Sequence, residues 1–359
     1  MKILHLASFD RWTGAAAPAF SEVEALRRAG VDAHYGYVGG STLEEKIGTF
    51  PFTHAILRRD QAPRAVARAV RGLRRDVAEG GYRVVHAHLA HDHWLARAAL
   101  RKLPGVALVR TFHAKRTIRT DPFSRWLVHG TDGVCVNNAA LASHGLLAKR
   151  SPLFTPPPVD ETLLRPGPDA RDAYGVPRDT PLLGFIGKVD RGRGFEEAIE
   201  TLALLRARGS AARLLIVGRG HHRAVLESLS ERLGVAGAVI WAGYHEDEDL
   251  AAHFRTPDLM LFTARGSDEG HRAIVEAMAC GTPVAAYPIY GVREILRFSA
   301  DRLLAAAETP AALADVCDRF FSGGERVTRE ECLAVTEPSR YGPTAERLVR
   351  FYESLIAGR

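Results

Sequence analysis

The chain has 359 residues, of which 46% are hydrophobic and 25% are charged. This length suits two globular domains, and the composition excludes a disordered or fibrous protein. The 48 Lys and Arg residues outnumber the 42 Asp and Glu residues, so the formal net charge of +6 suits anionic ligands or surfaces without specifying one.

The spacing of the cysteines and the length of the apolar segments indicate in which cellular compartment the protein is expected. The four cysteines lie far apart, without C-x-x-C or zinc spacing, at Cys135, Cys280, Cys317 and Cys332. A reducing compartment is therefore expected. The N-terminus lacks the basic and apolar pattern of a signal peptide, and no segment approaches the roughly 18 apolar residues of a transmembrane helix. These features predict a cytoplasmic protein.

The first half of the sequence alternates short apolar runs with helical patterns. Apolar runs of the kind buried in parallel sheets occur at residues 3–7, 33–38, 84–88, 106–111 and 133–137. An amphipathic stretch at 19–29, ended by Gly30, predicts a helix between the first two runs. This alternation predicts a doubly wound parallel sheet.

The pattern begins again after a proline-rich joint at residues 154–168. Strands are predicted at 182–189, 213–217, 238–242 and 259–263, and helices at 196–208, 223–233 and 344–356. We therefore predict an α/β protein with two Rossmann-like domains, residues 1–165 and 166–340, whose parallel sheets face each other across a cleft. A last helix occupies residues 341–359.

The most informative segment is 266–284, a loop rich in Ser, Asp and Gly that leads into a helix predicted at 272–280. This helix is almost entirely apolar, yet it carries Glu276, whose carboxylate must find a charged or hydrogen-bonding partner. The backbone N–H groups at the helix start form a ready site for an anion. A phosphate at the helix start and polyol hydroxyls along Glu276 would satisfy both.

This segment resembles the acidic motif of retaining glycosyltransferases of the GT-B fold, family 4, in which two Glu residues flank seven others before Ala-Met-Ala-x-Gly-x-Pro-Val. Counting back from Glu276 puts Asp268 at the first acidic position, whereas pairing with Glu269 leaves one residue too few. The alternative is structural: Asp268 caps the helix, and Glu276 forms an ion pair with Arg272.

A second motif follows the first predicted strand of the second half. Residues 185–194 resemble the family's Gly-Arg-Leu and Lys-Gly pattern, with the two basic residue types exchanged at Lys188 and Arg193. Two cations on a glycine-permissive loop suit a diphosphate, because each can neutralise one phosphoryl group as a sugar departs. Gly187 and Arg191 belong to the same loop. A solvated basic turn is the alternative.

Three further segments resemble parts of the family. Thr13 and Gly14 stand where the family has a glycine loop that closes over the donor, and Gly14 is the expected close-approach residue. His113 ends a Thr-x-His segment, and in the family this histidine lies near the reacting sugar. Gly218 opens a loop that often borders the nucleobase pocket there. A dinucleotide fingerprint is excluded at Gly218, since its third glycine is replaced by Arg223.

Two other clusters could suggest a metal. The first is His86, His88, His91 and His93, and the second is the acidic run 247–249. The histidine spacing is not that of metallohydrolases, and the acidic run precedes a helical pattern where acids favour the helix start. We expect no metal ligands and no cofactor, and we expect activity to survive chelation.

The resemblance implies a GT-B enzyme that transfers a sugar, with retention, from a nucleotide diphosphate sugar to a hydroxyl acceptor. Lys188, Arg193 and the N–H groups of residues 269–272, which include Gly270 and His271, would bind the diphosphate. Glu276 would bind the ribose, and Asp268 and His113 the donor sugar. The last helix would cross back to the first domain. The rivals are a sugar epimerase or phosphorylase, and a catalytically silent protein that binds an anionic membrane or partner.

Basic residues at helical spacing suggest an acceptor. They are Arg64, Arg68, Arg71 and Arg75, in the half that generally binds the acceptor in this family. A solvated helix face is the plain interpretation. The sharper hypothesis is a lipid-linked or otherwise anionic acceptor, such as a bacterial envelope glycolipid or polysaccharide precursor, with peripheral contact at the inner membrane face. No nucleic-acid partner is expected.

Overall fold

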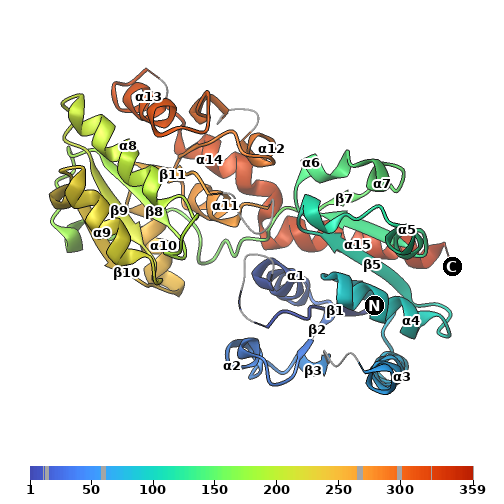
Figure 1. Ribbon diagram of the computed structural model, residues 1–359. Helices are drawn as coiled ribbons and strands as arrows, with labels where there is room; N and C mark the ends of the chain where they lie inside the picture. Colours follow the sequence, from blue (N-terminus) through green and yellow to red (C-terminus); the bar gives the residue numbers. More distant parts are fainter. Residues whose placement is uncertain are drawn as a thin grey trace. The chain divides into compact units, whose positions relative to one another are not determined.

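The computed structural model describes residues 1–10, 12, 16–57, 62–264, 270–296, 301–324 and 326–358 (Figure 1). The chain forms two compact units. Unit 1 contains Met1–Pro158, Ser267–Gly270 and Pro338–Arg359, and unit 2 contains Val159–Gly266 and His271–Glu337. The first boundary lies before the predicted position at 165, because Val159 and Leu164 already pack in the core of unit 2. The second lies at 337, before the predicted 340.

Unit 1 is built on a seven-stranded sheet in the order β3-β2-β1-β4-β5-β6-β7, and all of its neighbouring strands are parallel. The strands are β1 (Lys2–Leu6), β2 (Asp32–Val38), β3 (Thr53–Leu57), β4 (Val84–Ala87), β5 (Ala107–Phe112), β6 (Gly133–Val136) and β7 (Leu153–Phe154). The central strands are mostly apolar and almost completely buried, as expected for strands covered on both faces.

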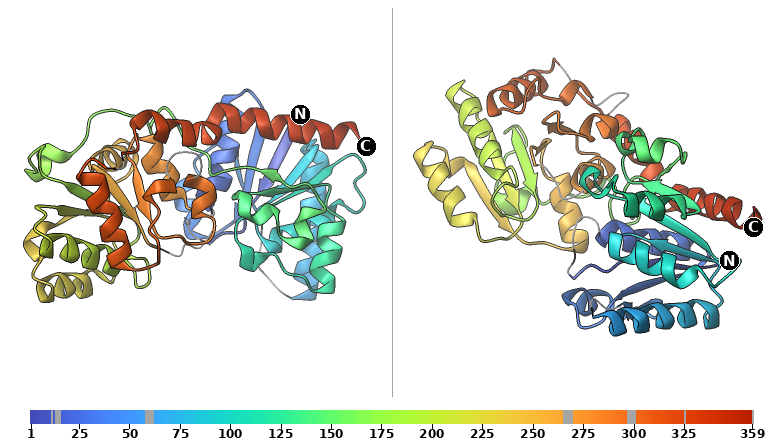
Figure 2. Two further views of the ribbon diagram at one scale, coloured as in Figure 1. Left: turned by 90° about the horizontal axis from the view of Figure 1, so that it is seen from above. Right: turned by 45° about the vertical axis from the view of Figure 1, so that its right-hand side comes forward.

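Helices cover both faces of this sheet. On one face α1 (Ala16–Arg28) packs against α15 (Tyr341–Ala357), and on the other α3 (Pro63–Glu79) packs against α4 (Ala90–Leu100). Figure 2 shows α15, the red helix at the C-terminal end of the chain, lying across the strands of the sheet. Its apolar stripe includes Leu348 and Tyr352, which are fully buried. The last helix therefore completes the core of unit 1.

Shorter helices of unit 1 lie between the strands. They are α2 (Thr42–Ile47), α5 (Pro122–His129), α6 (Ala139–Ala142) and α7 (Gly145–Ala148). The structure separates the arginines of α3 into two groups. Arg64, Arg68, Arg71 and Arg75 are exposed, whereas Arg74 is half-buried and donates hydrogen bonds to backbone carbonyls of α4.

Unit 2 has a five-stranded parallel sheet in the order β10-β9-β8-β11-β12. Its strands are β8 (Leu182–Ile186), β9 (Arg213–Val217), β10 (Val239–Gly243), β11 (Leu259–Phe262) and β12 (Val284–Ala286). Its helices are α8 (Phe195–Ala207), α9 (Arg223–Arg232), α10 (Asp247–Arg255), α11 (Arg272–Ala279), α12 (Val292–Leu296), α13 (Pro310–Phe321) and α14 (Arg329–Thr336). Among these, α8 packs against α13 and α11 against α14.

Both sheets contain a point where the strand order reverses. In unit 1 this point lies between β1 and β4, and in unit 2 it lies between β8 and β11. Ligands of doubly wound sheets bind beyond the carboxyl ends of the strands at such points. The predicted pair of Rossmann-like α/β domains is therefore confirmed, and its two switch points direct attention to the loops after β1, β4, β8 and β11.

Among the described residues, no helix combines the length and apolar character required to cross a bilayer. All four cysteines are buried and carry free thiols.

Candidate active site

The switch point of unit 2 is held together by a contact between Gly194 and Thr263. Thr263 follows β11, and its hydroxyl donates a hydrogen bond of 2.8 Å to the carbonyl oxygen of Gly194, the residue that precedes α8. Gly194 has a φ of 87°, and a Cβ atom there would lie 2.1 Å from the Thr263 hydroxyl oxygen. Only glycine therefore allows α8 to begin this close to the end of β11.

The basic loop lies directly before this contact, between β8 and α8. Lys188 is exposed over 59% of its side chain, and its Nζ lies 2.5 Å from Asp190 Oδ2. The hydrogen bond from Lys188 lowers the pKa of the Asp190 carboxyl, whose charge therefore persists at neutral pH. Arg193 is half-buried, whereas Gly187 and Arg191 are exposed. The loop thus presents cations at the switch point.

A second glycine fixes the backbone of this loop. Gly218, which follows β9, has a φ of 141°, and a Cβ atom there would lie 1.8 Å from the carbonyl oxygen of Gly187. Backbone hydrogen bonds from Gly187 to Val217 and from Val189 to Arg219, 3.0 and 3.1 Å long, extend the pairing beyond the two strands. The role of Gly218 in the structure is close backbone approach, consistent with the exclusion of a dinucleotide fingerprint.

The start of α11 carries a buried histidine. His271 precedes the helix with a φ of 42°, and its Nε2–H donates a hydrogen bond of 2.8 Å to the carbonyl of Tyr290. Burial lowers the pKa of His271, so the imidazole is neutral, and its Nδ1 has no hydrogen-bond partner among the described residues. Gly270, the residue before it, is also buried.

Glu276 is 8% exposed and pairs with Arg272 one turn earlier, with 2.6 Å between Oε1 and the guanidinium. The ion pair that the sequence offered as the structural alternative is therefore present. The pair gives the buried carboxylate a charged partner in a helix that is otherwise apolar. The remaining predicted residues of the donor site, Thr13, Gly14, Asp268 and Glu269, lie outside the described residues.

The predicted sugar-binding histidine belongs to unit 1. His113 follows β5, is only 5% exposed, and has its Nε2 3.2 Å from Nδ1 of His88. Burial, aided by the charge of Arg110, lowers the pKa of His113 to about 3. Its Nδ1 is buried without a partner among the described residues. His113 is therefore a neutral imidazole with one nitrogen still able to bind a polar group.

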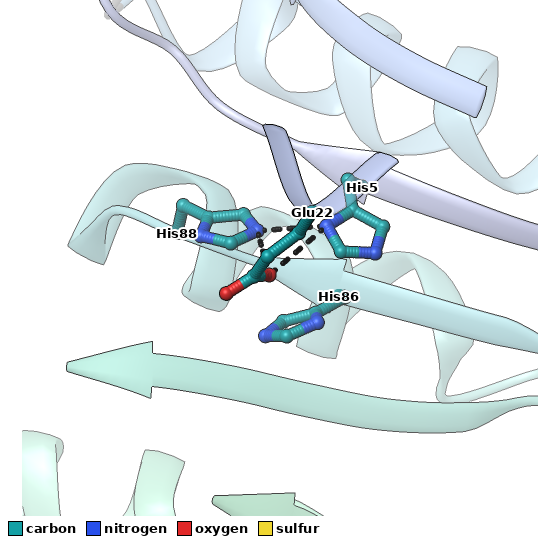
Figure 3. A group of neighbouring side chains, drawn as sticks. All are labelled: His5, Glu22, His86 and His88. Atoms are coloured by element: carbon teal, nitrogen blue, oxygen red, sulfur yellow. Dashed lines mark hydrogen bonds and ion pairs between the residues drawn. The ribbon is translucent and has the colours of Figure 1, made fainter. Parts of the chain in front are cut away.

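His88 leads from His113 into a buried cluster at the switch point of unit 1, drawn in Figure 3. The cluster consists of His5 on β1, His86 on β4, His88 just after β4, and Glu22 on α1. His5 and His86 occupy paired positions on neighbouring strands. Burial raises the pKa of Glu22 to about 8, against the opposing charge of Arg347.

This cluster differs from the one read from the sequence. His91 lies against Trp94, and His93 bonds to the hydroxyl of Thr131, so neither joins His86 and His88. His5 and Glu22 were not singled out. A signal was present in each case, since His5 interrupts an apolar strand and Glu22 lies among the buried residues of α1. The acidic run 247–249 occupies the first turn of α10, as predicted.

Two sequence families match the chain, one in each half. Glycosyltransferase Family 4 matches residues 12–148, and Glycosyl transferases group 1 matches residues 168–332. The chain is a GT-B glycosyltransferase of the family 4 type. The similarity therefore covers most of both units, including β4 of unit 1 and the two strands, β8 and β11, that meet at the switch point of unit 2.

Curated relatives agree with this assignment. A 2-deoxystreptamine glucosyltransferase of Streptomyces kanamyceticus is 26% identical over 272 residues, covering 69% of this chain and 70% of the relative. D-inositol 3-phosphate glycosyltransferase 1 of Catenulispora acidiphila is 28% identical over 331 residues, covering 82% of this chain and 77% of the relative.

Solved structures share the fold at lower identity. A glycosyltransferase from Rickettsia africae superposes with a TM-score of 0.83 at 15% identity, over 100% of this chain and 99% of the other. HepE of Anabaena, solved in complex with UDP, superposes with a TM-score of 0.80 at 17% identity, over 99% of this chain and 100% of HepE. These comparisons extend the GT-B fold over the full chain.

Proposed function

We propose that this glycosyltransferase moves a sugar from a nucleotide diphosphate sugar to a hydroxyl acceptor with retention of anomeric configuration. The observation that carries the proposal is the basic loop at residues 187–193, which is fixed by Gly218 and Gly194 at the switch point of unit 2. Support for the donor class comes from HepE of Anabaena, which was solved with UDP and with UDP-glucose.

The departing diphosphate is the group that most needs stabilisation, because negative charge accumulates on it as the glycosidic bond breaks. Lys188 and Arg193 neutralise this charge, with Arg191 as a third cation and the N–H groups at the start of α11 as further donors. Without substrate, Lys188 pairs with Asp190. Exchange of the partly exposed Asp190 for a phosphoryl oxygen costs little, since the exposed Lys188 side chain is already positioned by the pair.

Glu276 binds the ribose hydroxyls of the nucleotide. Arg272 orients the carboxylate through its contact with Oε1. An ionised carboxylate is a strong acceptor for two neighbouring hydroxyls. In this role the ion pair and the ribose contact coexist, so the structural and functional interpretations of Glu276 are not exclusive.

The donor sugar is bound by His113 and Asp268, as the family resemblance implies. His113 contributes a neutral imidazole whose Nδ1 is unpartnered among the described residues, so it can bind a sugar hydroxyl without adding charge. The acceptor hydroxyl attacks from the face that the diphosphate leaves, and a leaving phosphate oxygen takes its proton. The transfer step needs no metal, because the basic loop supplies the positive charge that a metal would bring.

The acceptor is proposed to be anionic or lipid-linked, such as a bacterial envelope glycolipid or polysaccharide precursor. The exposed arginines of α3 support this, since each basic residue near an anionic bilayer contributes about 1 kcal/mol of attraction. The enzyme would then act in the cytoplasm at the inner membrane face.

The donor assignment is tested by screening nucleoside diphosphates and their sugars by thermal shift, then assaying transfer with Lys188→Ala and Arg193→Ala. Each variant should lose roughly 100- to 1000-fold in kcat, as when one oxyanion donor is removed. Arg232→Ala, an exposed arginine of α9, is the matched control and should retain full turnover. Wild-type turnover in the double variant would refute the proposed diphosphate site, and acceptor-independent epimerisation of the donor sugar would identify a different reaction.

The roles of the two acids are separated by calorimetry with the free nucleoside diphosphate. Glu276→Ala should weaken its binding, because the ribose contact belongs to the nucleotide. Asp268→Ala should leave nucleotide binding intact and reduce transfer, because its partner is the sugar. The reverse pattern would exchange the two assignments.

A further inference from the structure

Three atoms in the buried cluster of unit 1 have an unusual spacing. His5 Nδ1 and His88 Nε2 lie 2.9 Å apart, and Glu22 Oε2 lies 3.6 Å from the first and 3.7 Å from the second. The two longer distances exceed those of hydrogen bonds. Glu22 Oε2 is accordingly buried with no hydrogen-bond partner among the described residues. A point equidistant from the three atoms lies about 2 Å from each, which is the zinc–nitrogen and zinc–oxygen distance in proteins.

We propose that His5, His88 and Glu22 bind a divalent transition metal, with zinc as the preferred ion. Two imidazoles and one carboxylate are a known zinc ligand set, and the remaining position of a tetrahedral ion goes to a water molecule. Figure 3 shows the side chains of His5, His88 and Glu22 converging on one point from β1, the end of β4 and α1.

The other nitrogen of each ligating histidine has a partner that would orient the ring. His5 Nε2 lies 3.3 Å from the hydroxyl of Tyr352 on α15, and His88 Nδ1 lies 3.2 Å from His113 Nε2. Metal-binding histidines commonly use the second nitrogen in this way, which sets the tautomer and the direction of the lone pair. The fold therefore supplies both the ligands and the groups behind them.

His86 has a different role. Its Nδ1 lies 2.7 Å from the Tyr352 hydroxyl and its Nε2 lies 2.6 Å from the Thr111 hydroxyl, so both ring nitrogens are engaged. Its ring is stacked on His88 with an interplanar angle of 21°. His86 therefore packs against the site without binding the ion.

A cation also removes the electrostatic cost of the cluster. Glu22 is 2% exposed and His5 and His88 are fully buried, so an ionised Glu22 without a close cation would be strongly disfavoured. The ion would connect β1, β4 and α1, and its expected role is to stabilise unit 1. This inference is independent of the proposed transfer chemistry.

Bound metal is first removed from the 359-residue protein with a chelator. The protein is then titrated with zinc alone and, separately, with cobalt alone. One equivalent of zinc should remain after gel filtration, measured by elemental analysis, and should raise the melting temperature. One equivalent of cobalt should produce the intense visible absorption of a four-coordinate ion. A folded wild-type protein that retains no zinc or cobalt would overturn the proposal.

Variants locate the ion. Glu22→Gln and His88→Gln should raise the dissociation constant for zinc by roughly 100-fold or more and abolish the cobalt absorption. The matched control is His93→Gln, a buried histidine of the neighbouring helix that bonds to Thr131. The His93→Gln variant should bind one equivalent of zinc with the affinity of the wild-type protein. If Glu22→Gln does not fold, His5→Gln and the wild-type cobalt spectrum decide the question. Loss of the metal in His93→Gln with retention in His88→Gln would overturn the assignment.

Discussion

At Gly218 and Gly194, the lack of a side chain determines the shape of the donor site. At both positions the backbone φ is positive and a Cβ atom would collide with a neighbouring loop. The backbone of residues 187–193 owes its position to these two close approaches, and the ion pair with Asp190 then orients the Lys188 side chain. Residues that never touch a substrate therefore control where the charged groups lie.

Gly218→Ala should destabilise unit 2 and weaken diphosphate binding together. The new Cβ atom would lie 1.8 Å from the Gly187 carbonyl oxygen, so the two loops must separate, and a cost of about 2 kcal/mol or more is expected. Urea denaturation and calorimetry with the nucleoside diphosphate measure the two effects. Gly237→Ala, which has open space around it and no positive φ, is the control. Equal stability of the two variants would contradict the proposed close packing.

Residues of the site differ in how far the sequence predicts them. Lys188 and Glu276 could be recognised because each lies in a local motif, a glycine loop and an apolar helix with one acid. His5 and Glu22 each carry a sequence signal, but their grouping could not be predicted, because their neighbours in space, His88 and Tyr352, come from distant segments that only the fold brings together. The Arg272 ion pair was predictable from helical spacing alone.

At the scale of elements, the predicted strands and helices agree closely where apolar periodicity is strong. The helix predicted at 272–280 is α11, and the strand predicted at 213–217 is β9. The strand predicted at 182–189 ends at Ile186. Beyond it, Gly187 and Val189 still donate backbone hydrogen bonds to Val217 and Arg219, but these residues belong to the loop that leads to α8. The short β12 and the helices α13 and α14 carried no motif, and the sequence did not single them out.

Helix α3 provides the test of the acceptor hypothesis. Replacement of Arg64, Arg68, Arg71 and Arg75 by Glu should abolish sedimentation with anionic vesicles, because these side chains are exposed and do not support the core. Wild-type binding should weaken as salt increases. A control variant in which the same four arginines are replaced by Lys keeps the positive charge of α3 and should sediment with anionic vesicles like the wild-type protein. Equal wild-type binding to neutral and anionic vesicles would favour a soluble acceptor.

At the scale of the whole molecule, the two units have separate cores, and the nucleoside diphosphate and the metal ion are proposed to bind in different units. The donor-site residues 187–193 and 271–276 belong to unit 2, and the proposed metal ligands belong to unit 1. Each ligand should therefore stabilise mainly its own unit, which makes their effects separable in one experiment.

Hydrogen exchange followed by mass spectrometry measures this separation. At a concentration 100 times its dissociation constant, the nucleoside diphosphate should stabilise unit 2 by about 2.7 kcal/mol, so its core amides should exchange about 100-fold more slowly. Chelation should accelerate exchange in β1, β4 and α1, while turnover per folded molecule persists. Loss of turnover in chelated protein that remains folded would refute a metal-independent transfer step.

Helix α15 belongs to unit 1 although unit 2 separates it in sequence from the rest of that unit. On the ribosome, the 158 N-terminal residues would emerge long before the helix that covers one face of their sheet. Unit 2 is nearly continuous and would be complete earlier, so the second unit in sequence is expected to be the first to finish folding. Until residues 341–357 arrive, His5 and His86 lack the Tyr352 hydroxyl, and the apolar face of the nascent sheet remains open to chaperones.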